Sequence, residues 1–143
     1  MEKKIVVVPV TGTDLYCHYP GQSDPQRAYI ELDVRTLRLS ARYNGEIGTA
    51  VPMDVYYGYR KRWEIPILTG AAATELMLSI VPLATRIVAG YTKIWNGNNY
   101  VARYTDDAHT AIEEIDDIAQ DACKNYDNGD LVSYDPDTFA LSI

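Results

Sequence analysis

The stretch "AYIELDVRTLRLSARY", residues 28–43, decides the fold. Apolar and polar residues alternate along residues 28–34 and again along residues 37–43. A period of two is typical of strands that bury one face and leave the other face polar. We therefore predict two antiparallel strands joined by a tight turn at Arg35 and Thr36.

Charges on the polar face of this strand pair indicate its register. Glu31 and Asp33 lie on the first strand, and Arg38 and Arg42 lie on the second. Opposite charges that face each other across an antiparallel pair stabilise it. We expect these four side chains to form cross-strand ion pairs.

The segments on either side of the strand pair are less regular. Residues 4–10 are rich in β-branched side chains and predict a strand, whereas residues 11–26 are rich in Gly, Pro, Ser and Asp and predict a loop. Two alternatives remain after residue 52. Residues 55–59 and 62–65 form a second hairpin, or they form one bent edge strand.

A helical period replaces the alternation after residue 69. Thr69 suits an N-cap and Gly90 suits a C-terminal end. Pro82 interrupts the pattern, because proline removes one backbone hydrogen bond and clashes with the preceding turn. We expect either a kink near residues 78–82 or two abutting helices. The apolar stripe, which we assign to the core, comprises Leu76, Ile80, Leu83 and Ile87.

Residues 91–104 predict a hairpin whose loop runs from Asn96 to Asn99, since Asn and Gly tolerate positive φ. A second helix follows, capped by Thr105 or Asp106, with alanine and isoleucine on its apolar side. Its exposed faces form an anionic ridge of Glu113, Glu114, Asp116, Asp117 and Asp121.

These elements fit a single α+β domain over residues 1–143. We predict an antiparallel sheet of four to six strands with two helices packed on one face. The end of the chain, residues 125–143, is polar and turn-rich up to "TFALSI". Those last residues either add a final strand or belong to a loosely ordered tail.

Charge is divided along the chain. Residues 1–103 contain twelve Lys or Arg and nine Asp or Glu, a balance of +3, whereas residues 104–143 contain one Lys and eleven acidic residues, a balance of −10. This division favours an interaction surface that selects partners by charge, although it would equally keep the protein soluble. The apolar run before Pro9 is too short for a signal peptide, so we predict a cytoplasmic location.

Catalytic patterns are weak. The sequence contains no glycine-rich phosphate loop, zinc-protease helix or nucleophile elbow. Cys17 and His18 could act as nucleophile and base only if folding brings a base such as His109 to the thiol. Cys17 and Cys123 match no metal or redox spacing, and we favour structural thiols over a disulfide. We expect no enzymatic activity, no cofactor and no metal site. The carboxylates that could in principle hold a divalent metal are Asp14, Glu31 and Asp33.

Residues 56–63, "YYGYRKRW", interleave aromatic rings with cations. We call them the Tyr/basic segment. Rings stack on unpaired bases and cations neutralise phosphates, but Tyr and Arg also dominate protein interfaces, and cations on an edge strand prevent aggregation. These three interpretations stay open. The candidate binding residues are Tyr56, Tyr57, Tyr59, Arg60, Lys61, Arg62 and Trp63.

Four segments carry a resemblance to a known set of proteins: "YNGEIGTAVP", "RWEIP", "VPLATRIVAGY" and "WNGNNYVARYTDDAHTAIEEI". They resemble small acidic accessory proteins of bacterial plasmids, phages and integrative elements, over about residues 28–120. The resemblance implies a context and no activity or functional residue. Such elements encode anti-CRISPR and antirestriction inhibitors, many of which occupy a basic nucleic-acid-binding surface and some of which imitate the charge of DNA.

The leading hypothesis is therefore a non-enzymatic, mobile-element-encoded inhibitor in a bacterial cytoplasm. It would bind a basic nucleic-acid-processing complex through the anionic ridge, the Tyr/basic segment or both. The alternative is an accessory protein that binds nucleic acid through the Tyr/basic segment, and a small metal-dependent nuclease or hydrolase is third. No membrane partner is expected, and the oligomeric state stays open, a dimer included.

Overall fold

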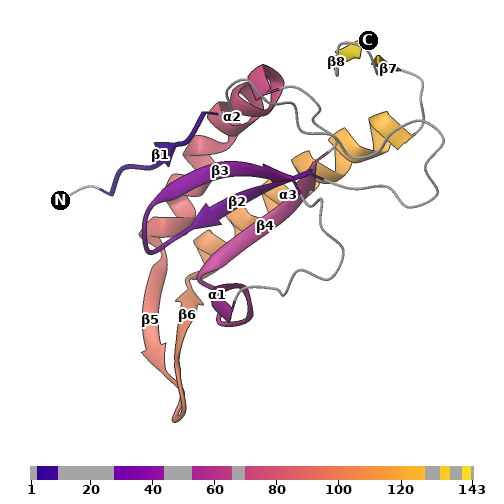
Figure 1. Ribbon diagram of the computed structural model, residues 1–143. Coiled ribbons are helices and arrows are strands. Elements are labelled where there is room, and N and C mark those ends of the chain that lie inside the picture. Colours follow the sequence, from indigo (N-terminus) through magenta and orange to yellow (C-terminus); the bar gives the residue numbers. More distant parts are fainter. Residues whose placement is uncertain are drawn as a thin grey trace.

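The computed structural model describes residues 3–9, 28–43, 53–65, 70–127, 133–135 and 140–142. It confirms the predicted α+β class: helices α2 and α3 pack against each other and cover one face of a four-stranded sheet (Figure 1). The predicted loop at residues 11–26, the N-cap at Thr69, and both Cys17 and His18 lie outside the described residues.

The main sheet has the strand order β1-β3-β2-β4. Strand β2 (Ala28–Asp33) pairs antiparallel with β3 (Arg38–Tyr43) on one side and with β4 (Arg60–Ile65) on the other. This confirms the predicted strand pair. The prediction of an antiparallel sheet is wrong at one edge, because β1 (Val6–Val7) runs parallel to β3.

Four residues, 34–37, form the turn between β2 and β3. The Asp33 carboxylate holds it by accepting hydrogen bonds from the backbone N–H groups of Arg35 at 2.9 Å and Thr36 at 3.2 Å. Leu37 completes the turn with a φ of 61°. Local hydrogen bonding by an Asp side chain is what makes this residue type favourable in turns.

Both alternatives for residues 55–59 are wrong. Residues Met53–Tyr56 form a one-turn helix, α1, and β4 starts only at Arg60. The backbone bends sharply between them, because Gly58 has a φ of 82° and Tyr59 N–H donates to the Asp54 carbonyl at 2.8 Å. A positive φ favours glycine and ends an extended strand. The other part of the prediction holds, since β4 is an edge strand of the described sheet.

Helix α2 spans Gly70–Ala89 and runs through Pro82 as one helix, so the alternative of two abutting helices is wrong. Pro82 lies on the exposed side of α2, where its ring meets solvent and not the core. Apolar side chains between α2, α3 (Asp106–Asp127) and the sheet form the core. Its largest fully buried members are Ile30, Leu32, Leu39, Ile65, Met77, Ile80, Ile87 and Ile115.

The predicted hairpin follows α2 and is made of β5 (Tyr91–Trp95) and β6 (Tyr100–Tyr104). It extends away from the sheet and the helices (Figure 1). Its two ends meet, since Thr105 N–H donates to the Gly90 carbonyl at 3.0 Å. Thr105 then caps α3 by accepting from the Ala108 N–H at 3.2 Å, which decides between the two predicted caps.

The anionic helix ends later than predicted, at Asp127. In the tail, β7 (Ser133–Asp135) pairs with β8 (Ala140–Ser142), so the predicted final strand forms within "TFALSI". It joins a separate two-stranded sheet and not the main one.

Candidate functional site

The sheet face opposite the helices carries two buried carboxylates. Glu31 is 3% exposed and Asp33 is 8% exposed, although the alternation placed both on the polar face of β2. A buried carboxylate is stable only when cations and hydrogen-bond donors compensate for its lost hydration. The surroundings of Glu31 and Asp33 therefore determine what this face can do.

Arginines from both neighbouring strands supply that compensation. Glu31 accepts a hydrogen bond from Arg62 Nε at 2.8 Å and forms ion pairs with Arg42 at 3.3 Å and Arg60 at 3.8 Å. Arg60 also lies 3.5 Å from Asp33. The predicted pair between Glu31 and Arg42 is confirmed, whereas the described residues give Arg38 no ion pair. The contributions of β4 were missed, because Arg60 and Arg62 lie some thirty residues further along the chain.

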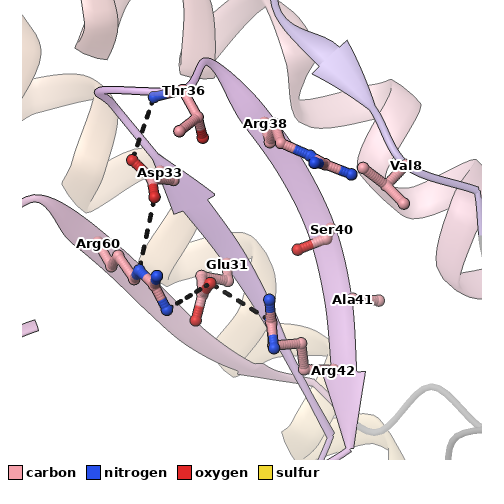
Figure 2. A pocket seen from close by; sticks show the side chains of 9 residues that line it. All are labelled: Val8, Glu31, Asp33, Thr36, Arg38, Ser40, Ala41, Arg42 and Arg60. Atoms are coloured by element: carbon pink, nitrogen blue, oxygen red, sulfur yellow. Dashed lines mark hydrogen bonds and ion pairs between the residues drawn. The ribbon is translucent and has the colours of Figure 1, made fainter. Parts of the chain in front are cut away.

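A cavity of about 460 Å³ opens above these groups (Figure 2). Strand β3 forms one wall, where the small side chain of Ser40 lies between Arg38 and Arg42. In Figure 2, Arg38 extends toward Val8 and takes part in none of the drawn contacts. The wall therefore offers the Arg38 guanidinium to an anionic group, since Arg42 is already paired with Glu31.

The metal hypothesis finds little support in this geometry. Guanidinium groups already surround Glu31, and Asp33 is committed to Arg60 and to the turn. Among the described residues no group of three or more His, Cys, Asp or Glu is placed to hold a metal ion. Asp14, the third carboxylate of that hypothesis, lies outside the described residues.

The Tyr/basic segment is split between two sides of the sheet. Tyr59 and Trp63 are buried in the core, and Lys61 lies on the same side with its Nζ 4.8 Å from the centre of the Tyr104 ring. Burial lowers the pKa of Lys61. Arg60 and Arg62 point to the opposite face and pair with the carboxylates. Period-two alternation separates these side chains, so they do not form one binding surface.

Only the start of that segment is open to solvent. Tyr56, on α1, is 70% exposed, whereas Tyr57 is half-buried and packs against the core. Arg62 also stacks over the Tyr29 ring, with Cζ 4.4 Å from its centre. The aromatic and cationic groups of residues 57–63 are thus largely occupied by contacts within the protein.

The predicted anionic ridge of α3 is exposed along its whole described length. Arg86 of α2 neutralises one side of it by pairing with Asp107 at 2.8 Å and with Glu114 at 3.1 Å. The hydrogen bond from Arg86 lowers the pKa of Asp107. On the other side, Gln120 donates to the Asp116 carboxylate at 2.9 Å.

The central line of the ridge has no such partner. Glu113, Asp117 and Asp121 lie at four-residue spacing, and none has an ion pair within the described part of the chain. We call these three residues the acidic stripe. Successive carboxylates lie about 6 Å apart along the helix axis, so the stripe is about 12 Å long.

The anionic ridge and the Tyr/basic segment face each other across a pocket between α3 and the edge strand β4. The pocket has a volume of about 340 Å³ and is lined by Arg62, Trp63, Glu64, Asp116, Ala119 and Gln120. Asp116 and Gln120 thus lie beside the Tyr/basic segment, while the acidic stripe lies on the part of α3 opposite its buried side.

The tip of the β5–β6 hairpin holds exposed aromatic residues that the sequence analysis did not single out. Trp95 is 55% exposed and Tyr100 is 50% exposed, and their ring centres are 5.0 Å apart. The signal was present in the sequence, because residues 91–104 combine aromatic residues with Lys93 and Arg103 and contain no acid. The Tyr/basic segment has a similar composition, but three of its four rings, Tyr57, Tyr59 and Trp63, pack in or against the core.

Two further features concern the wider setting of the site. His109 is exposed on α3, with its ring centre 6.0 Å from that of Tyr104. Burial raises the pKa of Tyr104.

Helix α2 is long and apolar enough to cross a membrane by length and composition alone, but one side of it is buried against the rest of the protein. That arrangement is typical of a core helix in a soluble-like α+β domain.

Comparisons with known proteins give one finding about family. No curated protein and no solved structure matches the chain. Residues 4–115, from just before β1 into α3, match the domain of unknown function DUF8280. Since this match covers most of the chain, the protein belongs to the DUF8280 family.

Proposed function

We propose that this protein is a non-enzymatic inhibitor that occupies a basic, nucleic-acid-binding surface of a partner complex in the bacterial cytoplasm. The observation that carries the proposal is the acidic stripe of α3, Glu113, Asp117 and Asp121, which is exposed and has no ion pair among the described residues. Carboxylates fixed on a rigid helix compete with phosphates for Arg and Lys side chains.

The internal contacts of the protein favour this surface over the other candidate. Arg60 and Arg62 of the Tyr/basic segment are paired with buried carboxylates, and Tyr59 and Trp63 belong to the core. Exposing them to nucleic acid would break those contacts. The origin of the inhibitor in a plasmid, phage or integrative element is supported only by the resemblance of the four segments named above.

Charge reversal on α3 tests the proposal. The tagged protein is used to capture partners from a nuclease-treated bacterial lysate, with duplex DNA added as competitor. We expect enrichment of nucleic-acid-binding proteins, displacement of them by the duplex, and loss of capture when Asp117→Lys is introduced at the centre of the acidic stripe. The loss should be at least tenfold, since a like charge inserted into an ionic contact costs several kcal/mol.

Glu75→Lys is the matched control, because Glu75 is an exposed acidic residue on α2 and the change in charge is identical. Capture that survives Asp117→Lys, or that falls equally with Glu75→Lys, contradicts the proposal. Partners without any affinity for nucleic acid would contradict it too.

A further inference from the structure

The β5–β6 hairpin exposes a pair of aromatic residues at its tip, where their rings add nothing to the hydrophobic core. Trp95 and Tyr100 face each other across the last pair of the hairpin, each at least half exposed. Their rings meet edge to face, about half of each residue is exposed, and the hairpin that carries them extends beyond the body of the sheet and helices (Figure 1). Exposed aromatic residues grouped in this way mark a binding surface more often than single exposed residues do.

The strand register places a cation on the same face. Lys93 pairs with Ala102 and Trp95 pairs with Tyr100, so these side chains all point to one side of the hairpin. The Nζ of Lys93 lies 4.2 Å from the centre of the Tyr100 ring. We call Lys93, Trp95 and Tyr100 the hairpin platform.

The positive charge of the hairpin favours a negatively charged partner. Residues 91–104 contain Lys93 and Arg103 and no acidic residue, and the described residues give neither cation an ion pair with a carboxylate. The acidic helix begins only at Asp106. Five strand residues separate it from the tip, about 16 Å at the usual rise. The Debye length at physiological salt is about 8 Å, so the carboxylates of α3 are screened from the platform.

We propose that the hairpin platform binds single-stranded nucleic acid. Trp95 and Tyr100 offer rings on which unpaired bases stack, and Lys93, on the same face, neutralises a phosphate. The turn leaves the side chains of Asn98 and Asn99 exposed for base edges, while Asn96 is occupied by hydrogen bonds from the backbone N–H groups of both. This site is separate from the acidic stripe and goes beyond the proposed function.

Fluorescence anisotropy of a labelled oligothymidine of about 12 nucleotides tests the proposal. We expect the wild-type protein to bind, and we expect Trp95→Ala and Tyr100→Ala each to weaken binding roughly tenfold, because each change removes one stacking surface. With about one phosphate neutralised by Lys93, the plot of log affinity against log salt should have a slope of about −0.7. A duplex of the same length should bind more weakly, since its bases are already stacked on each other.

Controls separate the platform from other surfaces. Lys4→Gln removes an exposed cation that belongs neither to the hairpin nor to the sheet cavity, and it should leave the affinity unchanged. Leu78→Ala shortens an equally exposed apolar residue on α2 and should also have no effect. Quenching of tryptophan fluorescence should disappear in Trp95→Ala, which retains the buried Trp63.

Two results would overturn the proposal. One is an oligonucleotide affinity that Trp95→Ala and Tyr100→Ala do not change. The other is absence of binding by the wild-type protein at low salt, which would assign the exposed rings to a protein partner instead. Because none of these changes touches Glu113, Asp117 or Asp121, failure here leaves the proposed function intact.

Discussion

Glu31 shows how a single buried charge can organise a sheet. Its carboxylate contacts arginines from β3 and from β4, and so it links β2 to both of its neighbouring strands. A one-residue slip of β2 would turn Glu31 toward the helices and leave Arg42 and Arg62 without a counter-charge, whereas Arg60 would keep Asp54. The cluster therefore opposes alternative registers as well as stabilising the native one.

Glu31→Gln should destabilise the fold by about 3 kcal/mol, because the amide cannot neutralise the arginines that remain around it. Urea denaturation measures the change in the free energy of unfolding. Glu113→Gln, an exposed residue without an ion pair among the described residues, should change stability by less than about 0.5 kcal/mol. Equal effects of the two substitutions would refute the assigned role of Glu31.

Sequence analysis could predict the alternation in residues 28–43 but not the burial of Glu31 and Asp33. The pattern of a strand says which residues share a face, and both carboxylates do share one. It does not say which side chains from distant segments cover that face. Arg60 and Arg62 were instead interpreted as candidates for binding, since their partners come from another strand.

At the scale of elements, Gly90 lies where the end of α2 packs closely against the start of α3. A Cβ at this position would lie 2.3 Å from Thr105 Oγ1 and 2.7 Å from Ala108 Cβ, closer than atoms can approach. The absence of a side chain therefore allows the end of α2 to pack against the first turn of α3. The sequence pattern indicates that Gly90 ends a helix, but it does not reveal this contact with α3.

Gly90→Ala should destabilise the protein by about 1–3 kcal/mol, the usual effect of overpacking at a close contact. The melting temperature measured by circular dichroism reports the change. Ala89→Ser, at the exposed neighbouring position, serves as control and should have little effect. A Gly90→Ala variant as stable as the wild-type protein would show that the two helices can separate at this point without loss.

The least predictable element was α1. A helix of four residues, Met53–Tyr56, is about one turn long, so it has no periodicity to detect. The existence of both longer helices and of the β5–β6 hairpin was predicted correctly, because their patterns extend over many residues. Of the two alternatives at Pro82, the break into two helices was wrong.

At the scale of the whole molecule, the acidic stripe places like charges next to one another on an exposed surface that contributes nothing to the core. Each pair of like charges four residues apart on a helix reduces stability by about 0.2–0.5 kcal/mol. Glu113, Asp117 and Asp121 form two such pairs. Sequence could predict the stripe, but whether it faced the Tyr/basic segment depended on how α3 packs against β4.

Asp117→Asn should therefore stabilise the protein by about 0.5 kcal/mol at low salt, since it removes both repulsive pairs. The gain should largely disappear at about 1 M salt, where the Debye length is about 3 Å. Thermal unfolding at the two salt concentrations measures the difference. Asp107→Asn is the contrasting variant: it removes a carboxylate paired with Arg86 and should not stabilise.

The contact between Gly90 and Thr105 has a consequence for how the family can diversify. The β5–β6 hairpin leaves and re-enters the fold at almost one point, because Thr105 N–H donates to the Gly90 carbonyl. Substitutions, insertions or a transplanted tip between Lys93 and Ala102 would not change the distance between the ends of α2 and α3. Relatives can thus acquire new tip sequences without redesigning the core, as antibodies exchange loops on a constant framework.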